Sequence, residues 1–251
     1  MIVQSPPSFI IRTEAEKAAS DNGFRISAGT KEGWIGFRST TVPVQIWIAS
    51  GSDHGPWLLA LNHSGVIAEL HLAKAVVPGP GIARYSFPAL NGLYEILPRI
   101  YQLGASLPNA PLRSFETQVA DLPRTTEAER SIVQRIGQNI FRASLMDYWQ
   151  GQCPLTGISD PALLRASHII AWADCESDAE RLNVHNGLLL SALWDAAFDR
   201  ALVTFTDEGT PEFAPELSET ARTELRWRSP VSLTDEHRKR LAHHRLRVHQ
   251  R

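Results

Sequence analysis

The chain has 251 residues, 43% of them hydrophobic, and a formal net charge of −2 at neutral pH. These values exclude a disordered or fibrous protein and argue weakly against nucleic-acid binding; they are typical of a soluble globular chain. No apolar run approaches the roughly 18 residues needed to cross a bilayer, and the start lacks the pattern of a secretion signal. Only two cysteines occur, Cys153 and Cys175, outside any Cys-x-x-Cys pair. The sequence thus excludes a disulfide framework and a four-cysteine zinc site, and it indicates a reducing cytoplasm.

The first hundred residues are predicted to be rich in β-strands. Residues 9–20 are expected to form a short helix. Runs of β-branched and aromatic residues predict strands within 41–50 and 56–72, and the N-H-S-G sequence of the second run is expected as a turn between two strands. An apolar stretch over 89–104 suggests another helix, and frequent Pro and Gly residues predict a linker over 104–123.

A long amphipathic helix is predicted next. Thr126 and Glu129 form the pair of a capping box at its start, and Gly151 is expected to end it. Apolar residues recur at steps of three and four and mark one helix face: Ile132, Val133, Ile136, Ile140, Phe141, Leu145 and Tyr148. Arg135 and Arg142 on the other face are candidates for phosphate contact, with a solvated polar face as the alternative.

Between residues 153 and 210 the pattern changes to short extended pieces. The sequence C-P-L-T-G at 153–157 predicts a strand running into a turn, and residues 163–172 predict a second extended piece. The polar segment 174–186 is expected as a loop. Residues 187–199 predict a strand that becomes a helix, and residues 201–210 a strand that closes on a turn.

The C-terminal residues form a basic run. From His237 to Arg251 the sequence has six Lys or Arg, four His and no acid. Ser232 and Asp235 are expected to cap a final basic helix. Such a run can bind phosphates even in a slightly acidic chain, and a solvated helix face is the alternative. The candidates for phosphate contact are Arg238, Lys239, Arg240 and Arg245.

His168 stands in an apolar stretch, where a lone histidine is usually a satisfied core residue. Asn186 follows eighteen residues later, and Asp195 nine residues after that. A neutral imidazole can take a proton from water near neutral pH, and a carboxylate can hold a hard cation. A histidine, an asparagine and an aspartate in this order are therefore a set suited to phosphodiester hydrolysis.

Four short motifs carry a resemblance to a known family. They are C-P-L-T-G at 153–157, R-A-S-H-I at 165–169, N-G-L-L-L at 186–190 and D-A-A-F-D at 195–199. In this order they resemble the HNH endonuclease family, most of all its branch with an Ala/Ser-His-Ile first motif and a Phe-Asp last motif. The resemblance covers roughly residues 126–205. It implies a ββα-metal fold in which a β-hairpin and a helix hold one divalent cation, Mg²⁺ or Mn²⁺, at the scissile phosphate of DNA.

The resemblance also implies roles for single residues. His168 is expected as the general base, Asp195 as the principal metal ligand, and Asn186 as the residue that orients His168 or its loop. Asp199 lies one helical turn after Asp195 and can join it, with helix capping as its alternative role. Ser167 occupies a position where many relatives carry an Asp ligand, and a serine hydroxyl is a poorer ligand.

Other positions depart from the family pattern or leave alternatives open. Asp195 stands where the family name promises a second histidine, which makes tight Zn²⁺ binding less attractive than Mg²⁺ binding. Arg165 and Arg181 flank the hairpin as candidates for phosphate contact, although Arg181 can equally pair with nearby acids. His185 is either a second imidazole at the site or an exposed loop residue.

The sequence therefore predicts an α+β chain: a β-rich domain over 1–103, the linker, and an HNH nuclease domain with a basic C-terminal helix over 124–251. The expected function is metal-dependent DNA cleavage in bacterial restriction or defence. Alternatives are a DNA-binding protein that has lost catalysis and a restriction enzyme that cuts only modified DNA. Trp34, Trp47 and Trp57 can stack a flipped or modified base, or pack a β core. No membrane partner is expected, and a homodimer is left open.

Overall fold

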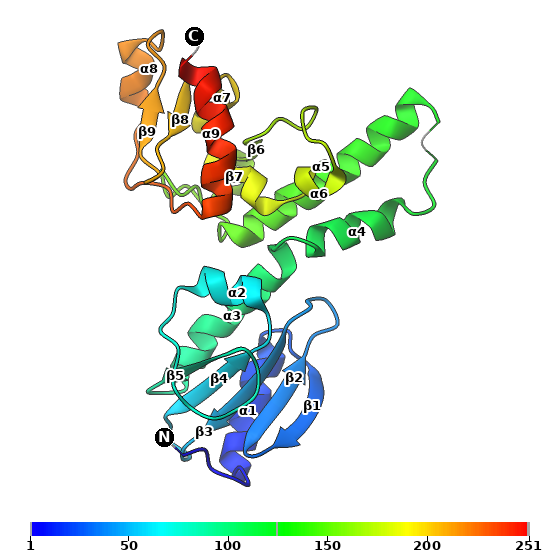
Figure 1. Ribbon diagram of the computed structural model, residues 1–251, viewed down its shortest axis with the longest axis vertical. Helices are drawn as coiled ribbons and strands as arrows, with labels where there is room; N and C mark the ends of the chain where they lie inside the picture. Colours follow the sequence, from blue (N-terminus) through cyan, green and yellow to red (C-terminus); the bar gives the residue numbers. More distant parts are fainter. Residues whose placement is uncertain (1, 124, 250–251) are drawn as a thin grey trace. The chain divides into compact units, whose positions relative to one another are not determined.

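The computed structural model describes residues 2–123 and 125–249 (Figure 1). The chain divides into two compact units, Met1–Ala105 and Ser106–Arg251. Helices and antiparallel sheets occur together, so the predicted α+β class is confirmed. The first residue of the predicted nuclease domain, 124, and the end of the basic run, 250–251, lie outside the described residues. In the described ranges, no helix combines the length and apolar character needed to cross a membrane.

The first unit is built on a five-stranded antiparallel sheet in the order β1-β2-β3-β4-β5. Its strands are Ile26–Lys31, Trp34–Arg38, Gln45–Ser50, Trp57–Leu61 and Ala83–Phe87. The helices that accompany the sheet are α1 (Phe9–Asp21), α2 (Ser64–Leu70) and α3 (Asn91–Ser106). Helix α1 contacts β2 and β3, and its fully buried alanines allow the close approach. Helices α1 and α3 confirm the predictions for residues 9–20 and 89–104.

Helix α2 shows that the prediction of two strands joined by N-H-S-G was wrong. Strand β4 ends at Leu61, but Nδ1 of His63 then accepts a hydrogen bond from the backbone N–H of Val66 at 3.2 Å. His63 thereby caps a helix where the second strand was expected. The helix has only seven residues, too few for its apolar period to distinguish a helix from a strand.

The tryptophans of the first unit do not form one cage. Trp34 packs in a core cluster with Leu58, and Trp47 lies against the same cluster. Trp57 neighbours Leu58 on β4 and points to the opposite face, because side chains alternate along a strand. Trp34 and Trp57 are buried, which agrees with the alternative that they pack the β core.

The segment 104–123, expected as a linker, is largely helical. Helix α4 (Ala110–Val119) contacts α5 (Glu127–Tyr148) and buries Phe115 and Val119. Pro111 lies in the first turn of α4, where a helix needs no backbone N–H. The proline that suggested a linker is therefore compatible with the start of a helix.

Helix α5 begins with the predicted capping box. Thr126 Oγ1 accepts a hydrogen bond from the Glu129 N–H at 3.2 Å, and the Glu129 carboxylate accepts one from the Thr126 N–H at 2.9 Å. The helix ends shortly before Gly151, as predicted. Its apolar face is buried only in the second half: Phe141 is buried, whereas Ile132 is 54% exposed.

Short elements follow α5. Strands β6 (Leu164–His168) and β7 (Gly187–Ser191) pair antiparallel, and β7 runs directly into α7 (Ala192–Asp199), as predicted. Residues 153–157 form a turn instead of the predicted strand, and the Gly157 N–H donates to the Cys153 carbonyl at 2.9 Å. The remaining short helices are η1 (Pro161–Leu163), α6 (Asp178–Arg181) and η2 (Val184–Asn186), the last two within the expected loop 174–186.

The last elements of the second unit are two strands and two helices. Strands β8 (Val203–Phe205) and β9 (Pro211–Phe213) pair antiparallel and are followed by α8 (Glu219–Glu224) and α9 (Asp235–His249). Helix α9 contacts β8 and η2. Its start differs from the predicted cap: Thr234 Oγ1 lies 2.8 Å from Nδ1 of His237, while Ser232 is exposed and Asp235 is already helical.

Candidate active site

The imidazole of His168 lies at the end of β6 in a setting that fixes its orientation. It stacks on Phe141 of α5 with ring centroids 3.8 Å apart and an interplanar angle of 17°. The ring of Trp172 meets it edge-on, with centroids 5.6 Å apart. Nε2 lies 2.9 Å from the backbone oxygen of Arg181. A carbonyl oxygen can only accept a hydrogen bond, so Nε2 carries the proton of the neutral ring and Nδ1 keeps the lone pair.

Burial keeps this imidazole neutral. It lowers the pKa of His168 below the usual value of 6.5, and the hydrogen bond to the Arg181 carbonyl opposes that shift in part. At neutral pH the ring is therefore uncharged, and Nδ1 is able to accept a proton. Sequence reasoning missed the contact with Phe141, because the periodicity of α5 marks it only as an apolar residue.

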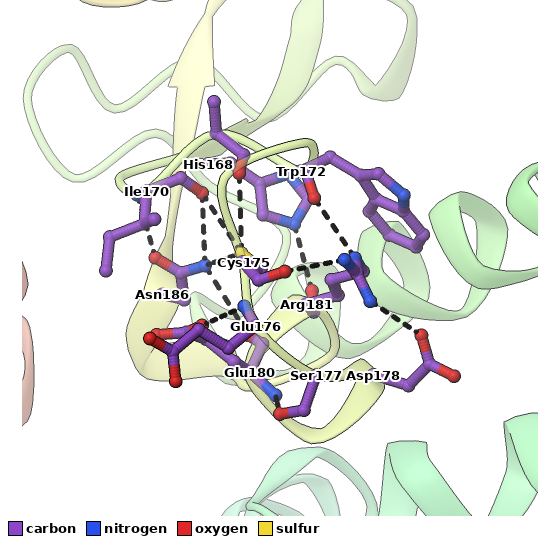
Figure 2. A network of polar contacts seen from close by, with 11 residues as sticks. His168, Ile170, Trp172, Cys175, Glu176, Ser177, Asp178, Glu180, Arg181 and Asn186 are labelled. Atoms are coloured by element: carbon purple, nitrogen blue, oxygen red, sulfur yellow. Dashed lines mark hydrogen bonds and ion pairs between the residues drawn. The ribbon is translucent and has the colours of Figure 1, made fainter.

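Asn186 holds the loop after His168 through both ends of its amide (Figure 2). Its buried Oδ1 accepts a hydrogen bond from the Ile170 N–H at 2.9 Å, and Nδ2 donates to the Ile170 carbonyl at 3.2 Å. Nδ2 also lies 3.3 Å from Sγ of Cys175. Of the two alternatives left by the sequence, the amide contacts the loop and not the imidazole. Asn186 has the contacts of a positioning residue.

Arg181 uses all three guanidinium nitrogens inside the protein, which does not fit the predicted phosphate contact. Nε donates to the Trp172 carbonyl at 3.0 Å, and the two Nη atoms reach Asp178 at 3.1 Å and the Cys175 carbonyl at 2.5 Å. Figure 2 shows that the backbone oxygen of the same residue accepts the hydrogen bond of His168. One residue therefore holds both the imidazole and the loop that follows it.

Asp195, the carboxylate expected as the principal metal ligand, contacts Ser167. Ser167 Oγ donates a hydrogen bond to Oδ1 of Asp195 at 2.6 Å. Burial raises the pKa of the Asp195 carboxyl, the Ser167 bond lowers it, the exposed Asp199 raises it and Arg165 lowers it, in decreasing order of effect. The net effect is a raised pKa, and burial of the carboxyl is its main cause.

The structure divides the expected site residues into two groups. Ser167 and His168 are adjacent on β6, and adjacent side chains of a strand point to opposite faces. Ser167 accordingly contacts Asp195 on α7, and His168 contacts Phe141 on α5. Among the described residues, no group of three His, Cys, Asp or Glu side chains could hold a metal ion. The oxygen donors around Asp195 nevertheless fit a hard cation such as Mg²⁺, which keeps several of its waters.

The other arginines near the hairpin differ in their freedom to bind phosphate. Arg142 donates to the carbonyls of Leu164 and Pro161 at 2.8 and 2.7 Å, so it holds the start of β6. Arg165 is exposed, although one of its nitrogens donates to two nearby backbone carbonyls at 2.9 and 3.0 Å. Arg135 is exposed on α5. Arg142 thus has a structural role at β6, and its phosphate contact stays a prediction.

Four basic residues of α9 that are candidates for phosphate contact are paired within the second unit. Each of the four candidates has a carboxylate partner within 3.0 Å: Arg238 with Asp235, Lys239 and Arg240 with Glu236, and Arg245 with Asp207. Hydrogen bonds from Lys239 and Arg240 lower the pKa of Glu236 to about 2. Acids of the first helical turn thus pair with three of these bases and Asp207 pairs with the fourth, so the run carries less free positive charge than its sequence suggests.

His185 is a buried residue of η2 and not an exposed loop residue. It is 8% exposed, and its ring meets those of Tyr148 and His237 edge-on with centroids 5.6 and 5.1 Å apart. It therefore belongs to an aromatic cluster between α5, η2 and α9. Cys153 and Cys175 are buried free thiols, in agreement with the absence of a predicted disulfide framework.

A family model described as HNH endonuclease matches residues 153–206. The matched segment runs from the C-P-L-T-G turn through the β6–β7 hairpin and α7, so it includes His168, Asn186 and Asp195. No curated protein matches the chain. The resemblance found in the sequence is thus confirmed by a match of residues 153–206 to the HNH endonuclease family model.

Proposed function

We propose that this protein hydrolyses phosphodiester bonds of DNA with the help of a divalent cation. The observation that carries the proposal is the imidazole of His168, held within an HNH domain as a neutral ring with its lone pair on Nδ1. Phosphodiester hydrolysis by this family requires an oriented base and a cation.

His168 acts as the general base of the proposed reaction. Nδ1 takes a proton from the attacking water, and the resulting imidazolium keeps its Nε2–H bond to the Arg181 carbonyl. The carbonyl dipole stabilises this charge, while the stack on Phe141 prevents the ring from turning its lone pair away from the water. Asn186 and Arg181 act as positioning residues, since both hold the backbone that follows His168.

Asp195 is the proposed metal ligand, with Asp199 one turn later and Ser167 bonded to the Asp195 carboxylate. A cation bound there, Mg²⁺ or Mn²⁺, would neutralise charge at the phosphorus and stabilise the departing 3′ oxygen. The Ser167 hydroxyl orients the carboxylate, a role compatible with its weak power as a direct ligand. Arg165 lies close enough to influence Asp195 electrostatically and is a candidate contact for the same phosphate.

A DNA-binding protein that has lost catalysis is the second candidate, and one observation favours it. In the described ranges, His168 and Asp195 make contacts on different sides of β6, and three metal-ligating side chains do not gather. The two functions are separated by plasmid nicking with Mg²⁺ or Mn²⁺, measured for the wild type and for Asp195→Asn. The nuclease proposal expects nicking that the substitution abolishes. DNA binding by both proteins with nicking by neither would favour the second candidate.

We further propose a role in bacterial restriction or defence in the cytoplasm, with residues 1–103 as the region that selects DNA. Trp34 and Trp47 line a pocket of about 370 Å³ together with Lys31 and Glu32, which supports a third candidate, a nuclease for modified DNA. That candidate predicts cleavage of methylated or hydroxymethylated DNA only. Equal cleavage rates on modified and unmodified DNA would eliminate it. The homodimer stays a prediction.

A further inference from the structure

The segment Arg226–Arg228, between α8 and α9, places two arginines and a tryptophan at the surface of the second unit. Trp227 is 40% exposed, and both arginines are exposed. Unlike the basic residues of α9, neither guanidinium has a hydrogen bond or an ion pair with the residues that the structure describes. Two unpaired cations around an exposed indole suit a partner with negative charges and flat rings.

These side chains line a pocket of about 510 Å³. Its other walls include Thr156 of the C-P-L-T-G turn and Ser191 and Leu193 at the junction of β7 and α7. Leu193 is apolar but 53% exposed. The acidic residue that lines the pocket is Glu224, two residues before Arg226. The pocket therefore joins a basic, aromatic segment to the first turn of α7, the helix that carries Asp195.

Backbone contacts fix the segment against the HNH domain while its cationic side chains stay unpaired. Nε1 of Trp194 donates to the Arg226 carbonyl at 3.1 Å, and the Arg228 N–H donates to the Leu155 carbonyl at 2.8 Å. A Cβ at Gly157 would lie 2.9 Å from Nη1 of Arg228, so the glycine leaves room for this guanidinium beside the turn. A preorganised backbone reduces the entropy that a bound ligand must overcome.

The pocket is close to Asp195 on the scale of a nucleic-acid strand. Ser191, the N-cap residue of α7, precedes Asp195 by four residues, so the two lie about one helical turn apart on the same side of the helix. The pocket wall at Ser191 thus lies about one helical pitch, about 5.4 Å, from Asp195 along the axis of α7. One strand of duplex DNA carries a charge about every 3.4 Å of its axis. A strand with one phosphate at Asp195 would have its next one or two phosphates beside the pocket.

We propose that Arg226, Trp227 and Arg228 form a DNA-binding surface next to the scissile phosphate. The two guanidinium groups bind neighbouring backbone phosphates, and the indole stacks on an unpaired base or packs against a sugar. The inference rests on the proposed function, since it names how the same substrate is held. It assigns phosphate binding to residues outside the matched segment 153–206 and away from the basic run of α9.

The test is DNA binding by the full chain in EDTA, measured by fluorescence anisotropy with a labelled duplex over a range of salt concentrations. Each lost phosphate contact reduces the slope of log affinity against log salt by about 0.9, so Arg226→Gln/Arg228→Gln should reduce it by about 1.8. Affinity at 0.1 M salt should fall by about tenfold or more. The matched control Arg238→Gln/Lys239→Gln removes the same charge from α9 and should keep the wild-type slope. Trp227→Ala should weaken binding without changing the slope, because stacking releases no counterions.

Circular dichroism and thermal melting establish that the exposed substitutions leave the fold intact. The proposal would be overturned if Arg226→Gln/Arg228→Gln bound DNA with the wild-type affinity and the wild-type salt dependence. It would also be overturned if the α9 control lost as much affinity and slope, because net charge alone would then explain the effect. Absence of DNA binding by the wild type would also overturn it. If the wild type binds DNA with the expected salt dependence but never nicks it, the DNA-binding surface is supported and the nuclease function is refuted. Nicking by the double variant at the wild-type rate and affinity would leave the nuclease function and refute the surface.

Discussion

Replacement of Arg181 by methionine should open the loop that follows His168. The guanidinium holds the carbonyls of Trp172 and Cys175 at 3.0 and 2.5 Å, and methionine keeps an apolar stem without any donor. The Arg181 backbone oxygen remains available to the imidazole after the substitution. The substitution removes the hydrogen bonds that connect residue 181 to the carbonyls of Trp172 and Cys175.

The expected cost of this change is about 3 kcal/mol of local stability. A hydrogen bond from a charged group contributes about 1.5 to 3 kcal/mol, and two such bonds at the lower limit suit a side chain that is 23% exposed. The ion pair with Asp178 adds at most about 1 kcal/mol, because the carboxylate is 42% exposed. About 3 kcal/mol corresponds to a change on the order of 100-fold in a local opening equilibrium.

Amide hydrogen exchange measures this opening. The N–H groups of Asp174 and Cys175 donate to the Ala171 carbonyl at 2.8 and 3.2 Å, within the loop that Arg181 holds. In Arg181→Met their exchange should accelerate on the order of 100-fold. The amide of Ile170 should change less, since the Asn186 side chain holds it. The cleavage rate constant should fall at unchanged KM, because the loop positions the base and not the DNA.

Asp178→Asn is the matched control for Arg181→Met. It removes the ion pair but leaves both carbonyl contacts, so the exchange of the Asp174 and Cys175 amides should change less than about fivefold. Unchanged protection of these amides in Arg181→Met would refute the reasoning. Equal losses in the two variants would refute it too, because the ion pair would then account for the effect.

Two further predictions concern the core of the second unit. Burial lowers the pKa of His244 to about 4, below its unfolded value near 6.5. The contribution of the neutral His244 to stability is therefore complete above pH 6.5 and is lost as the pH falls toward 4. Between pH 7 and pH 5 the wild type should lose about 2 kcal/mol more stability toward urea than His244→Gln, and equal losses would contradict this account. Gly187→Ala should destabilise the unit by about 1 to 3 kcal/mol, since the new Cβ overlaps the ring of Phe141. An unchanged melting temperature would show that the Phe141–His168 stack can move.

Elements with a strong local pattern could be predicted from the sequence. The capping pair Thr126 and Glu129 and the three- and four-residue apolar steps suffice to place α5. The change from a continuous apolar run to a helical period at Ser191 likewise places β7 and α7. Helix α2 was missed because its cap is the side chain of His63, an uncommon capping residue, and α4 because Pro111 suggested a linker.

The contacts of the candidate site depend on residues that the sequence does not bring together. The acceptors of Arg181 are backbone oxygens, which no side-chain pattern records. Arg245 forms an ion pair with Asp207, although 38 residues separate them in the sequence. By contrast, the pairing of Glu236 with Lys239 and Arg240 at helical spacing was visible in the sequence. The Arg-Trp-Arg run at 226–228 was also visible, and only its exposure required the structure.

Plasmid nicking by His168→Ala, with and without added imidazole, tests the central claim most directly. A general base contributes about 100- to 10,000-fold, so the variant should nick supercoiled plasmid in Mn²⁺ at least about 100-fold more slowly than the wild type. The space beside Phe141 should admit free imidazole, which restores part of the rate without changing the affinity for DNA. Nicking by His168→Ala at the wild-type rate would contradict the assignment of His168 as the base.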